Sequence, residues 1–570
     1  MRPGAGLGAR SGFTPGAAIA AGYLLAAAMV LRNLWADPGR RYLVDGGQDQ
    51  NQWEWFFAVT ARSVTRLDHP LFTTLQNFPD GVNLMGNTVM LGASVPLAPV
   101  TLLCGPSATW ALVLTFGLAG TATGWYLLMR RRLGASRAAA AVGGAFCGFA
   151  PPMVSHANAH PNFVVLVLLP FIVGRLIALA RDGRVVRDGV LLGLLAAYQV
   201  HLGEEPLLLA ATGLAVFAAV YAVAAPAAAR AAARPLAAGA VIALAVFLPL
   251  STYPLVWQFA GPQSYDGLLH GPAGNDVAVL PAFARQSLGG HPAAPGPLDV
   301  STTEQNAFFG WSVVALVVAL VAWSWREPLV RALAGVVVGA ALLSLGPEIV
   351  VGGEPSGVPG PWRVMARLPL YESVLESRLT MVCVPAIGLL LALGTDRLRG
   401  RAPAGLCGAL LAVALLPVVP KPLPAVDRAP TPAFFTDGTW RRYVPPGRSV
   451  VPVPLPDAAD AAALRWQADA GLGFPVAEGY FVGPFGPDRL GGYGAPRRPT
   501  SELLRRVRDG GRPPIGDAER AAARADLAHW RAGAVVLGPH PRHAELRAAV
   551  EALLGPGRPD GGVRVWEVER

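Results

Sequence analysis

Eleven apolar runs, separated by short polar connections, fill most of the first 420 residues and constrain the fold more than any other feature. A helix needs about 20 apolar residues to cross a bilayer, and fewer where protein surrounds it. Only 15% of residues are charged, against about 25% in soluble proteins. We therefore expect a mainly α polytopic bundle with about 11 spans. The runs are 15–34, 108–129, 137–151, 161–180, 187–202, 206–225, 235–257, 308–324, 329–349, 378–395 and 404–420.

Short basic clusters lie between these runs, as is typical of cytoplasmic loops. The net charge of +10 therefore reflects membrane topology, and the absence of a basic stripe with interleaved aromatic residues argues against a nucleic-acid partner. Arg2 and Arg10 place the N-terminus in the cytoplasm, with 15–34 as a first span rather than a cleaved signal. The clusters are Arg130–Arg132 with Arg137, Arg181 with Arg184 and Arg187, and Arg397 with Arg399 and Arg401.

Residues 88–105 decide the topology. They are apolar but short, and they contain Pro96 and Pro99. A full crossing would put the later basic loops outside, whereas a re-entrant or interfacial element keeps them inside, and we adopt the second interpretation. The non-cytoplasmic face then holds the loops 35–107, 151–162, 201–206, 258–307 and 350–377, together with the C-terminal domain.

The C-terminal domain, residues 421–570, follows a transmembrane domain of residues 1–420 and begins with a proline-rich linker. Its pattern predicts a mixed α/β fold outside the membrane, with a small sheet and a crossover. It contains no nucleophile elbow, phosphate loop or cysteine, so it is expected to cover the outer mouth. Strands are predicted at 449–456, 532–539 and 563–569, and helices at 459–470, 516–530 and 543–554.

The first outer loop contains VDGGQDQNQWEWFFAVTARSV, in which Asp45 and Asp49 precede an amphipathic helix. Its aromatic face, residues 53–57, suits the lipid headgroup boundary. A carboxylate held there is placed to deprotonate an acceptor hydroxyl. The alternative for either aspartate is capping the helix that starts near Gln50.

Two further outer motifs carry ionisable groups. In HLGEEP, the side chains of Glu204 and Glu205 point about 100° apart, so only one of them is expected to face a site. The alternative is that they interact with the positive N-terminal end of the following helix dipole. In SHANAHPN, His156 and His160 share a helix face, and with Asn158 they could donate to a polar group or bind a metal or phosphate. We assign no metal from this pattern.

The segment PWRVMARLPLYESVLESR places Arg363, Arg367 and Arg378 outside, against the usual bias of basic residues toward the cytoplasm. Arginine suits bidentate phosphate binding, and Arg378 at the mouth of an apolar run is the strongest candidate. The alternative is pairing with Glu372, Glu376 or anionic headgroups.

Together these motifs resemble the GT-C class of integral membrane glycosyltransferases over residues 15 to about 400. The similar segments are LVDGGQDQNQWEW, HPLFTTLQNFPDGVNL and LGASRAAAAVGGAFCGFAPPMVSHANAH. The resemblance implies transfer of a sugar from a polyprenyl-phosphate donor to a glycan, lipid or protein acceptor on the outer face of the cell membrane. It also implies that Asp49 is the general base. Asp45 is the alternative base, because the usual Gly-Asp pair of the family is here Gln-Asp. The arginines of 363–378 are implied to hold the donor phosphate. Some members need a divalent metal, and no cofactor is certain here.

The residues independently favour a lipid-linked donor, because the chain has no Rossmann-type glycine motif for a cytoplasmic nucleotide sugar. A transporter or lipid flippase is the main alternative, and it would predict inverted repeats and broken helices at mid-membrane. A non-catalytic envelope assembly protein is the second. No repeat is evident, and the ionisable residues gather at helix ends.

Overall fold

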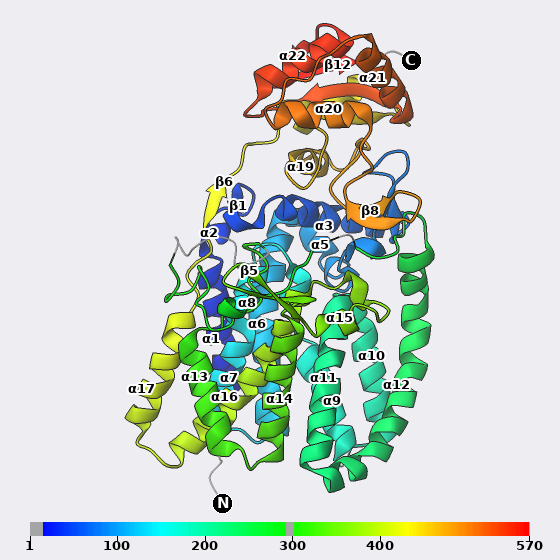
Figure 1. Ribbon diagram of the computed structural model, residues 1–570. Helices are drawn as coiled ribbons and strands as arrows, with labels where there is room; N and C mark the ends of the chain where they lie inside the picture. Colours follow the sequence, from blue (N-terminus) through cyan, green and yellow to red (C-terminus); the bar gives the residue numbers. More distant parts are fainter. Residues whose placement is uncertain (1–14, 182, 269, 292–300, 569–570) are drawn as a thin grey trace, which may run out of the picture.

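The computed structural model describes residues 15–181, 183–268, 270–291 and 301–568. A helical body, residues 15–420, forms the lower part of the molecule in Figure 1, and the C-terminal segment, residues 421–568, sits at its upper end. Arg2 and Arg10 lie outside the described residues.

Each of the eleven apolar runs contains a helix. By length and composition, four helical stretches of the described chain are able to cross a membrane: α6, α11, α12, and the stretch Glu376–Arg399, which combines the 3₁₀ turn η6 (Glu376–Val382) with α16. The eleven helices are α1 (Pro15–Val30), α6 (Pro106–Arg132), α7 (Arg137–Phe149), α9 (Leu169–Ala180), α10 (Val185–Val200), α11 (Glu204–Ala224), α12 (Pro226–Ala260), α13 (Trp311–Ser324), α14 (Pro328–Leu343), α16 (Cys383–Arg399) and α17 (Ala404–Leu415).

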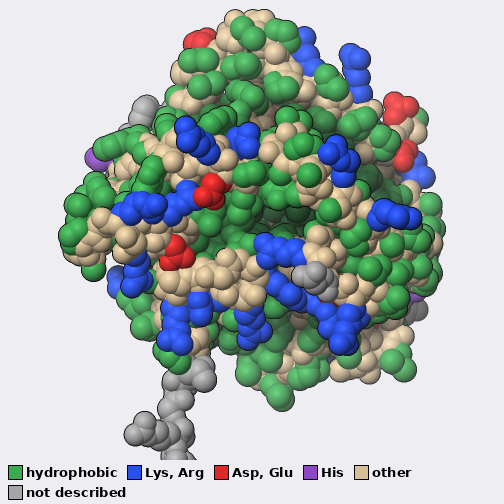
Figure 2. Space-filling view, turned by 90° about the horizontal axis from the view of Figure 1, so that it is seen from below, with side chains coloured by type: hydrophobic (Ala, Val, Ile, Leu, Met, Phe, Trp, Pro, Cys, Tyr) green, Lys and Arg blue, Asp and Glu red, His purple; other side chains and the backbone are tan. Residues whose placement is uncertain are grey.

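The end of the helical body away from the C-terminal segment carries a ring of Lys and Arg side chains with few acidic ones (Figure 2). Helix α6 finishes with Arg130–Arg132, and α16 finishes with Arg397 and Arg399. Cations at a helix C-terminus are favoured by the helix dipole.

Residues 88–105 form two short helices, α4 (Leu91–Ser94) and α5 (Ala98–Cys104). At 1.5 Å per residue, the seven residues of α5 extend about 10 Å, much less than the thickness of a bilayer. Leu102 and Leu103 on α5 are exposed. Neither helix is therefore long enough to cross a bilayer by itself.

Helix α3 (Asp49–Arg66) lies across the upper end of the body, between the other helices and the C-terminal segment (Figure 1). Its aromatic face is covered by protein: Trp53, Trp55, Phe56 and Phe57 are all buried, and α3 packs against α5, α6 and α19 (Ala462–Asp469). The expectation that these rings meet lipid headgroups is therefore wrong.

The C-terminal segment folds around a four-stranded sheet in the order β11-β12-β10-β7. Strands β7 (Ser449–Val453) and β10 (Ala532–Leu537) are parallel, while β12 (Val563–Glu567) runs antiparallel to β10 and to β11 (Arg558–Asp560). Alternate residues serve two cores: Val450 and Val536 join the core that continues into the helical body, whereas Val451 and Val535 face α20, α21 and α22. These helices are α20 (Pro499–Arg508), α21 (Asp517–His529) and α22 (His543–Leu554).

Two small two-stranded sheets connect the helical body with the C-terminal segment. The pair β1–β6 ties the first loop to the linker after α17, and the hairpin β8–β9 descends from the C-terminal segment toward the body. The remaining elements are α2 (Arg32–Trp35), β1 (Arg41–Leu43), β2 (Phe72–Thr73), β3 (Val82–Asn83), α8 (Pro151–His156), β4 (Glu348–Val351), β5 (Glu354–Pro359), α15 (Trp362–Met365), β6 (Ala425–Asp427), α18 (Ala433–Thr436), β8 (Val482–Phe485) and β9 (Leu490–Tyr493).

Candidate functional site

A cluster of charged and imidazole side chains lies at the upper ends of the helices. Its members come from five segments of the chain: α3, the end of α8 with the turn that follows it, the first turn of α11, the loop before α13, and η6. They are Asp49, His156, His160, Glu205, Glu304 and Arg378, and each has an ion-pair contact within the group.

Arg378 is the centre of this cluster. Its Nη1 donates to Glu205 Oε2 at 2.7 Å, its Nε donates to Glu304 Oε2 at 3.1 Å, and its Nη2 donates to Glu304 Oε1. The guanidinium carbon also lies 4.6 Å from the centre of the Phe163 ring. Three of its five N–H groups are thus engaged by protein within the described residues, and neither Glu372 nor Glu376 is the partner.

The tautomer of His156 follows from its hydrogen bonds. Asn306 Nδ2 donates to Glu304 Oε2 at 2.7 Å, so Asn306 Oδ1 is an acceptor, and it lies 2.7 Å from His156 Nε2. His156 therefore carries its proton on Nε2. Burial lowers the pKa of His156 to about 3, so the ring is neutral. Its unprotonated Nδ1 lies 3.1 Å from His160 Nδ1, within hydrogen-bond distance.

Asp49 is the first residue of α3, and Gln48 occupies the capping position without a side-chain cap bond. The Asp49 side chain points to the cluster instead. Its Oδ1 accepts a hydrogen bond from the Tyr480 hydroxyl at 2.5 Å, and its Oδ2 lies 3.7 Å from His160 Nε2. Burial raises the pKa of the Asp49 carboxyl, although His160 and the Tyr480 hydrogen bond oppose this effect.

The two adjacent glutamates separate as expected. Glu205 binds Arg378, whereas Glu204 Oε1 accepts from Gln258 Nε2 at 2.9 Å and from Thr88 Oγ1 at 3.3 Å. Both belong to the first turn of α11, so they also lie at the positive end of its dipole. One glutamate of the pair therefore faces the cluster and the other supports its neighbourhood.

Four other residues singled out from the sequence lie outside the cluster. Asp45 pairs with Arg285 at 2.7 Å and accepts from Gln286. Asn158 donates within its own turn, to Ser155 O at 3.1 Å. Arg363 and Arg367 are exposed, and Arg363 Nε donates to Pro347 O at 2.6 Å.

Sequence reasoning missed three members of the neighbourhood: Glu304, Asn306 and Tyr480. The polar run TEQN at 303–306, just before an apolar run, is the same kind of signal as HLGEEP and could have identified Glu304. Tyr480 offers no comparable pattern, because it meets Asp49 across 431 residues of chain.

The cluster fits a divalent cation. His156, His160 and Glu304 offer ligand atoms within 4.8 Å of one another. The separations are 3.1 Å between the two Nδ1 atoms and 3.5 Å from His160 Nδ1 to Glu304 Oε1, close to the ~3.3 Å between ligand atoms in tetrahedral zinc sites. Two carboxylates, Glu205 and Glu304, contact the Arg378 guanidinium, and a third, Asp49, lies beside His160.

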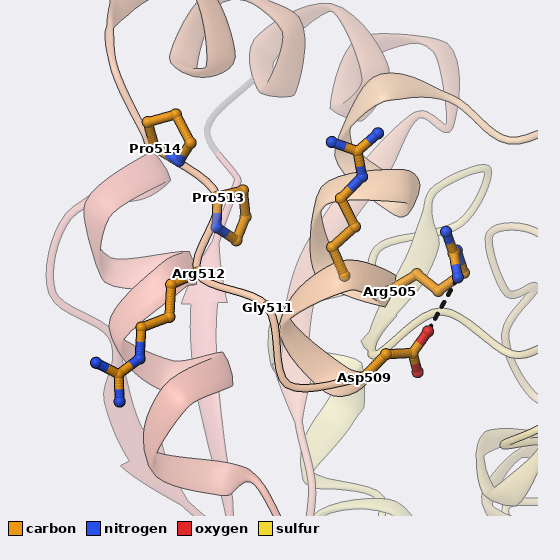
Figure 3. A pocket seen from close by; sticks show the side chains of 7 residues that line it. Arg505, Asp509, Gly511, Arg512, Pro513 and Pro514 are labelled. Carbon is orange, nitrogen blue, oxygen red and sulfur yellow. Dashed lines mark hydrogen bonds and ion pairs between the residues drawn. The ribbon is translucent and has the colours of Figure 1, made fainter.

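A wide basic groove of about 350 Å³ lies elsewhere, at the end of α20, between Arg505, Arg506 and Arg512. Figure 3 shows Arg505 turned toward Asp509, while Arg512 points away on the other side of the loop. Since these guanidinium groups diverge, the groove does not form a clamp for one anion.

No known family model and no curated protein matches the chain. Among solved structures, the apo oligosaccharyltransferase of Archaeoglobus fulgidus is similar at 14% identity and a TM-score of 0.44, covering 80% of this chain and 64% of its own. AglB of the same organism, in complex with an inhibitory peptide and a dolichol-phosphate, is 12% identical with a TM-score of 0.48. The match covers 97% of this chain and 74% of AglB. ArnT from Cupriavidus metallidurans, bound to undecaprenyl phosphate, is 12% identical with a TM-score of 0.40. The match covers 95% of this chain and 77% of ArnT. The chain thus spans about 64% of the length of the first of these structures.

Proposed function

We propose that the protein is a membrane glycosyltransferase that moves a sugar from a polyprenyl-phosphate donor to an acceptor hydroxyl on the non-cytoplasmic side. The acceptor belongs to a glycan, a lipid or a protein. One observation carries this proposal: Asp49 of the first loop meets the His156, His160, Glu304 and Arg378 cluster at the end of the helical body opposite the basic ring.

Asp49 is the general base. It takes the proton of the acceptor hydroxyl while that oxygen bonds to the anomeric carbon and the carbon–oxygen bond to the donor phosphate breaks. The raised pKa of its buried carboxyl makes it a stronger base than an exposed aspartate. Asp45 is the weaker candidate, because its carboxylate is held by Arg285 and Gln286.

The phosphate leaves with the bonding electrons, so its oxygens need positive charge. Two N–H groups of Arg378 have no hydrogen-bond partner among the described residues and can serve this purpose, and Glu205 and Glu304 orient the guanidinium. A divalent cation, when held by His156, His160 and Glu304, supplies further charge for the leaving phosphate. The neutral His156 ring suits this role, because its Nδ1 lone pair is free of a proton.

The membrane placement is part of the proposal: a cytoplasmic N-terminus, about 11 spans in residues 1–420, and residues 421–570 outside. Helix α13 supports it, because exposed tryptophans lie at both of its ends, Trp311 at one and Trp323 and Trp325 at the other. Such aromatic residues are enriched at both membrane–water interfaces. The basic ring lies at the opposite end of the body from the cluster (Figures 1 and 2).

Purified protein in lipid, supplied with radiolabelled polyprenyl-phosphate sugars and membrane acceptors, tests the proposal. We expect the wild type to transfer the sugar. Asp49→Asn should lower the transfer rate at least 100-fold, and a chelator should also lower it. The exposed control Glu372→Gln should leave the rate unchanged. Intact thermal unfolding of each variant excludes misfolding. Full transfer by Asp49→Asn would move the base elsewhere, and movement of the donor across vesicles without transfer would favour a flippase.

A further inference from the structure

The C-terminal segment reaches into the cluster through Tyr480. This side chain is only 7% exposed, and its hydroxyl donates to Asp49 Oδ1 at 2.5 Å. We propose that Tyr480 is a positioning residue that fixes the Asp49 carboxylate for the acceptor, so that the C-terminal segment completes the site rather than merely covering it. This inference rests on the glycosyltransferase function proposed above.

The backbone of Tyr480 is tied to the helical body on both sides. Its N–H donates to Gln76 Oε1 at 3.1 Å, and its carbonyl accepts from Gln52 Nε2 at 3.0 Å. Gln52 lies on α3, three residues after Asp49, so the same helix carries the carboxylate and holds the residue that orients it. The contact is therefore not a chance approach of a free side chain.

The hairpin that follows Tyr480 fixes the approach further. Val482 exchanges two hydrogen bonds with the Asn87 side chain, at 2.6 and 2.9 Å. Gly491 N donates to Gly267 O at 2.6 Å, and Arg489 Nη2 donates to Ser264 O at 2.6 Å. Both strands of β8–β9 are thus bound to loops of the helical body, and Tyr480 has little freedom to withdraw.

This arrangement assigns separate roles to the two oxygens of Asp49. Oδ1 is occupied by the Tyr480 hydroxyl, whereas Oδ2 lies 3.7 Å from His160 Nε2, beyond hydrogen-bond distance. Oδ2 therefore remains available to take the acceptor proton. A base must be held within hydrogen-bond reach of that proton, and a carboxylate bonded at one oxygen cannot rotate freely away.

Tyr480→Phe removes only the hydroxyl and is the primary test, with Tyr443→Phe as its matched control. Tyr443 belongs to the same segment and also donates to an aspartate, Asp560 Oδ2 at 2.6 Å, outside the cluster. We expect Tyr480→Phe to lower kcat about 10-fold with the donor KM unchanged, and Tyr443→Phe to leave both unchanged. In an Asp49→Asn background, Tyr480→Phe should cause no further loss, because the effect passes through Asp49.

The outcomes separate the two proposals. Absent transfer by the wild type rejects the glycosyltransferase function itself. If Asp49→Asn lowers wild-type transfer but Tyr480→Phe leaves it intact or accelerates it, the positioning role alone is rejected. The same holds if Tyr480→Phe causes an equal loss in the Asp49→Asn background, whose residual transfer is measured with long incubations. If Tyr480→Phe does not fold, Gln52→Ala, which frees the Tyr480 carbonyl, replaces it with the same expected fall in kcat and unchanged KM.

Discussion

Single residues of the site could be predicted where a polar group interrupts an apolar run, and the glutamate pair is the clearest case. Helix geometry alone sends Glu204 and Glu205 in directions about 100° apart, and in the structure one of them meets Arg378 while the other meets Gln258. The partner of Arg378 could not be predicted in the same way. Glu304 is close to Arg378 only because the loop before α13 folds back over η6, which no local pattern records.

Arg378 provides the first prediction. Lysine keeps the charge but has no planar fork, so Arg378→Lys loses the bidentate contact with Glu304 that Arg378 combines with its bond to Glu205. We expect transfer to fall at least 10-fold in kcat/KM, which corresponds to about 1.4 kcal/mol or more. The exposed Arg363→Lys is the matched control and should retain full activity. Equal rates for both variants would remove Arg378 from the site.

Glu478 provides a prediction for stability. It is 7% exposed, and burial raises the pKa of its carboxyl to about 7 despite hydrogen bonds from Ser501 and Arg498 and the nearby Arg497. Because the folded pKa exceeds the usual 4.5, the carboxyl favours folding below pH 4.5, and this contribution is lost as the pH rises to 7. The loss amounts to about 3 kcal/mol.

Glu478→Gln removes this ionisation. We expect its melting temperature to exceed that of the wild type by several degrees at pH 8 and by much less at pH 5, measured by thermal unfolding in detergent. The exposed Glu545→Gln should show no such pH-dependent difference. A constant difference across this range would mean that Glu478 is ionised at the same pH in both states.

Among the elements, α3 marks the limit of what its sequence pattern could reveal. The spacing of Trp53, Trp55, Phe56 and Phe57 correctly indicates an apolar helix face, but a lipid surface and a protein surface select the same residues. Part of what covers this helix is α19, about 400 residues later in the chain. Trp55 Nε1 donates to Gln467 Oε1 at 2.6 Å, a contact that only the folded chain creates.

Close packing of α7 against α16 provides the element-scale prediction. A Cβ added to Gly143 would lie 2.5 Å from the Gly388 carbonyl oxygen, so the two backbones touch without side chains between them. Helix α7 continues toward His156 through α8, and η6 with Arg378 leads directly into α16. Separating the two helices would therefore also separate two parts of the cluster.

We expect Gly143→Ala to destabilise the protein by about 1–3 kcal/mol and to reduce transfer. Gly408→Ala on α17 is the control, because its Cβ would meet nothing within 4 Å and alanine favours a helix. Thermal unfolding and the transfer assay measure both effects. Equal behaviour of the two variants would show that α7 and α16 can move apart without cost to the site.

For the whole molecule, the sequence predicted the helices and most of the C-terminal sheet, because their signals are local. The runs of apolar residues became helices, and the predicted strands at 449–456, 532–539 and 563–569 correspond to β7, β10 and β12. The hairpin β8–β9 was missed, since its sequence is rich in glycine and proline and its position depends on Asn87 and Gly267 of the helical body. Long-range pairing of this kind leaves no periodicity.

Sidedness is the last prediction, and it tests the molecule as a unit. In a background with Cys104 replaced by serine, a cysteine at exposed Asp488, between β8 and β9, should react with a membrane-impermeant maleimide on intact cells. A cysteine at exposed Ala404, the first residue of α17 and close to the basic residues that end α16, should react only after permeabilisation, because basic loops stay in the cytoplasm. Asp49 lies beside the hairpin that carries position 488, so the labelled side is the side of the cluster. Reaction of Ala404→Cys from outside would place the cluster in the cytoplasm, where nucleotide sugars are present and the reason for a lipid-linked donor disappears.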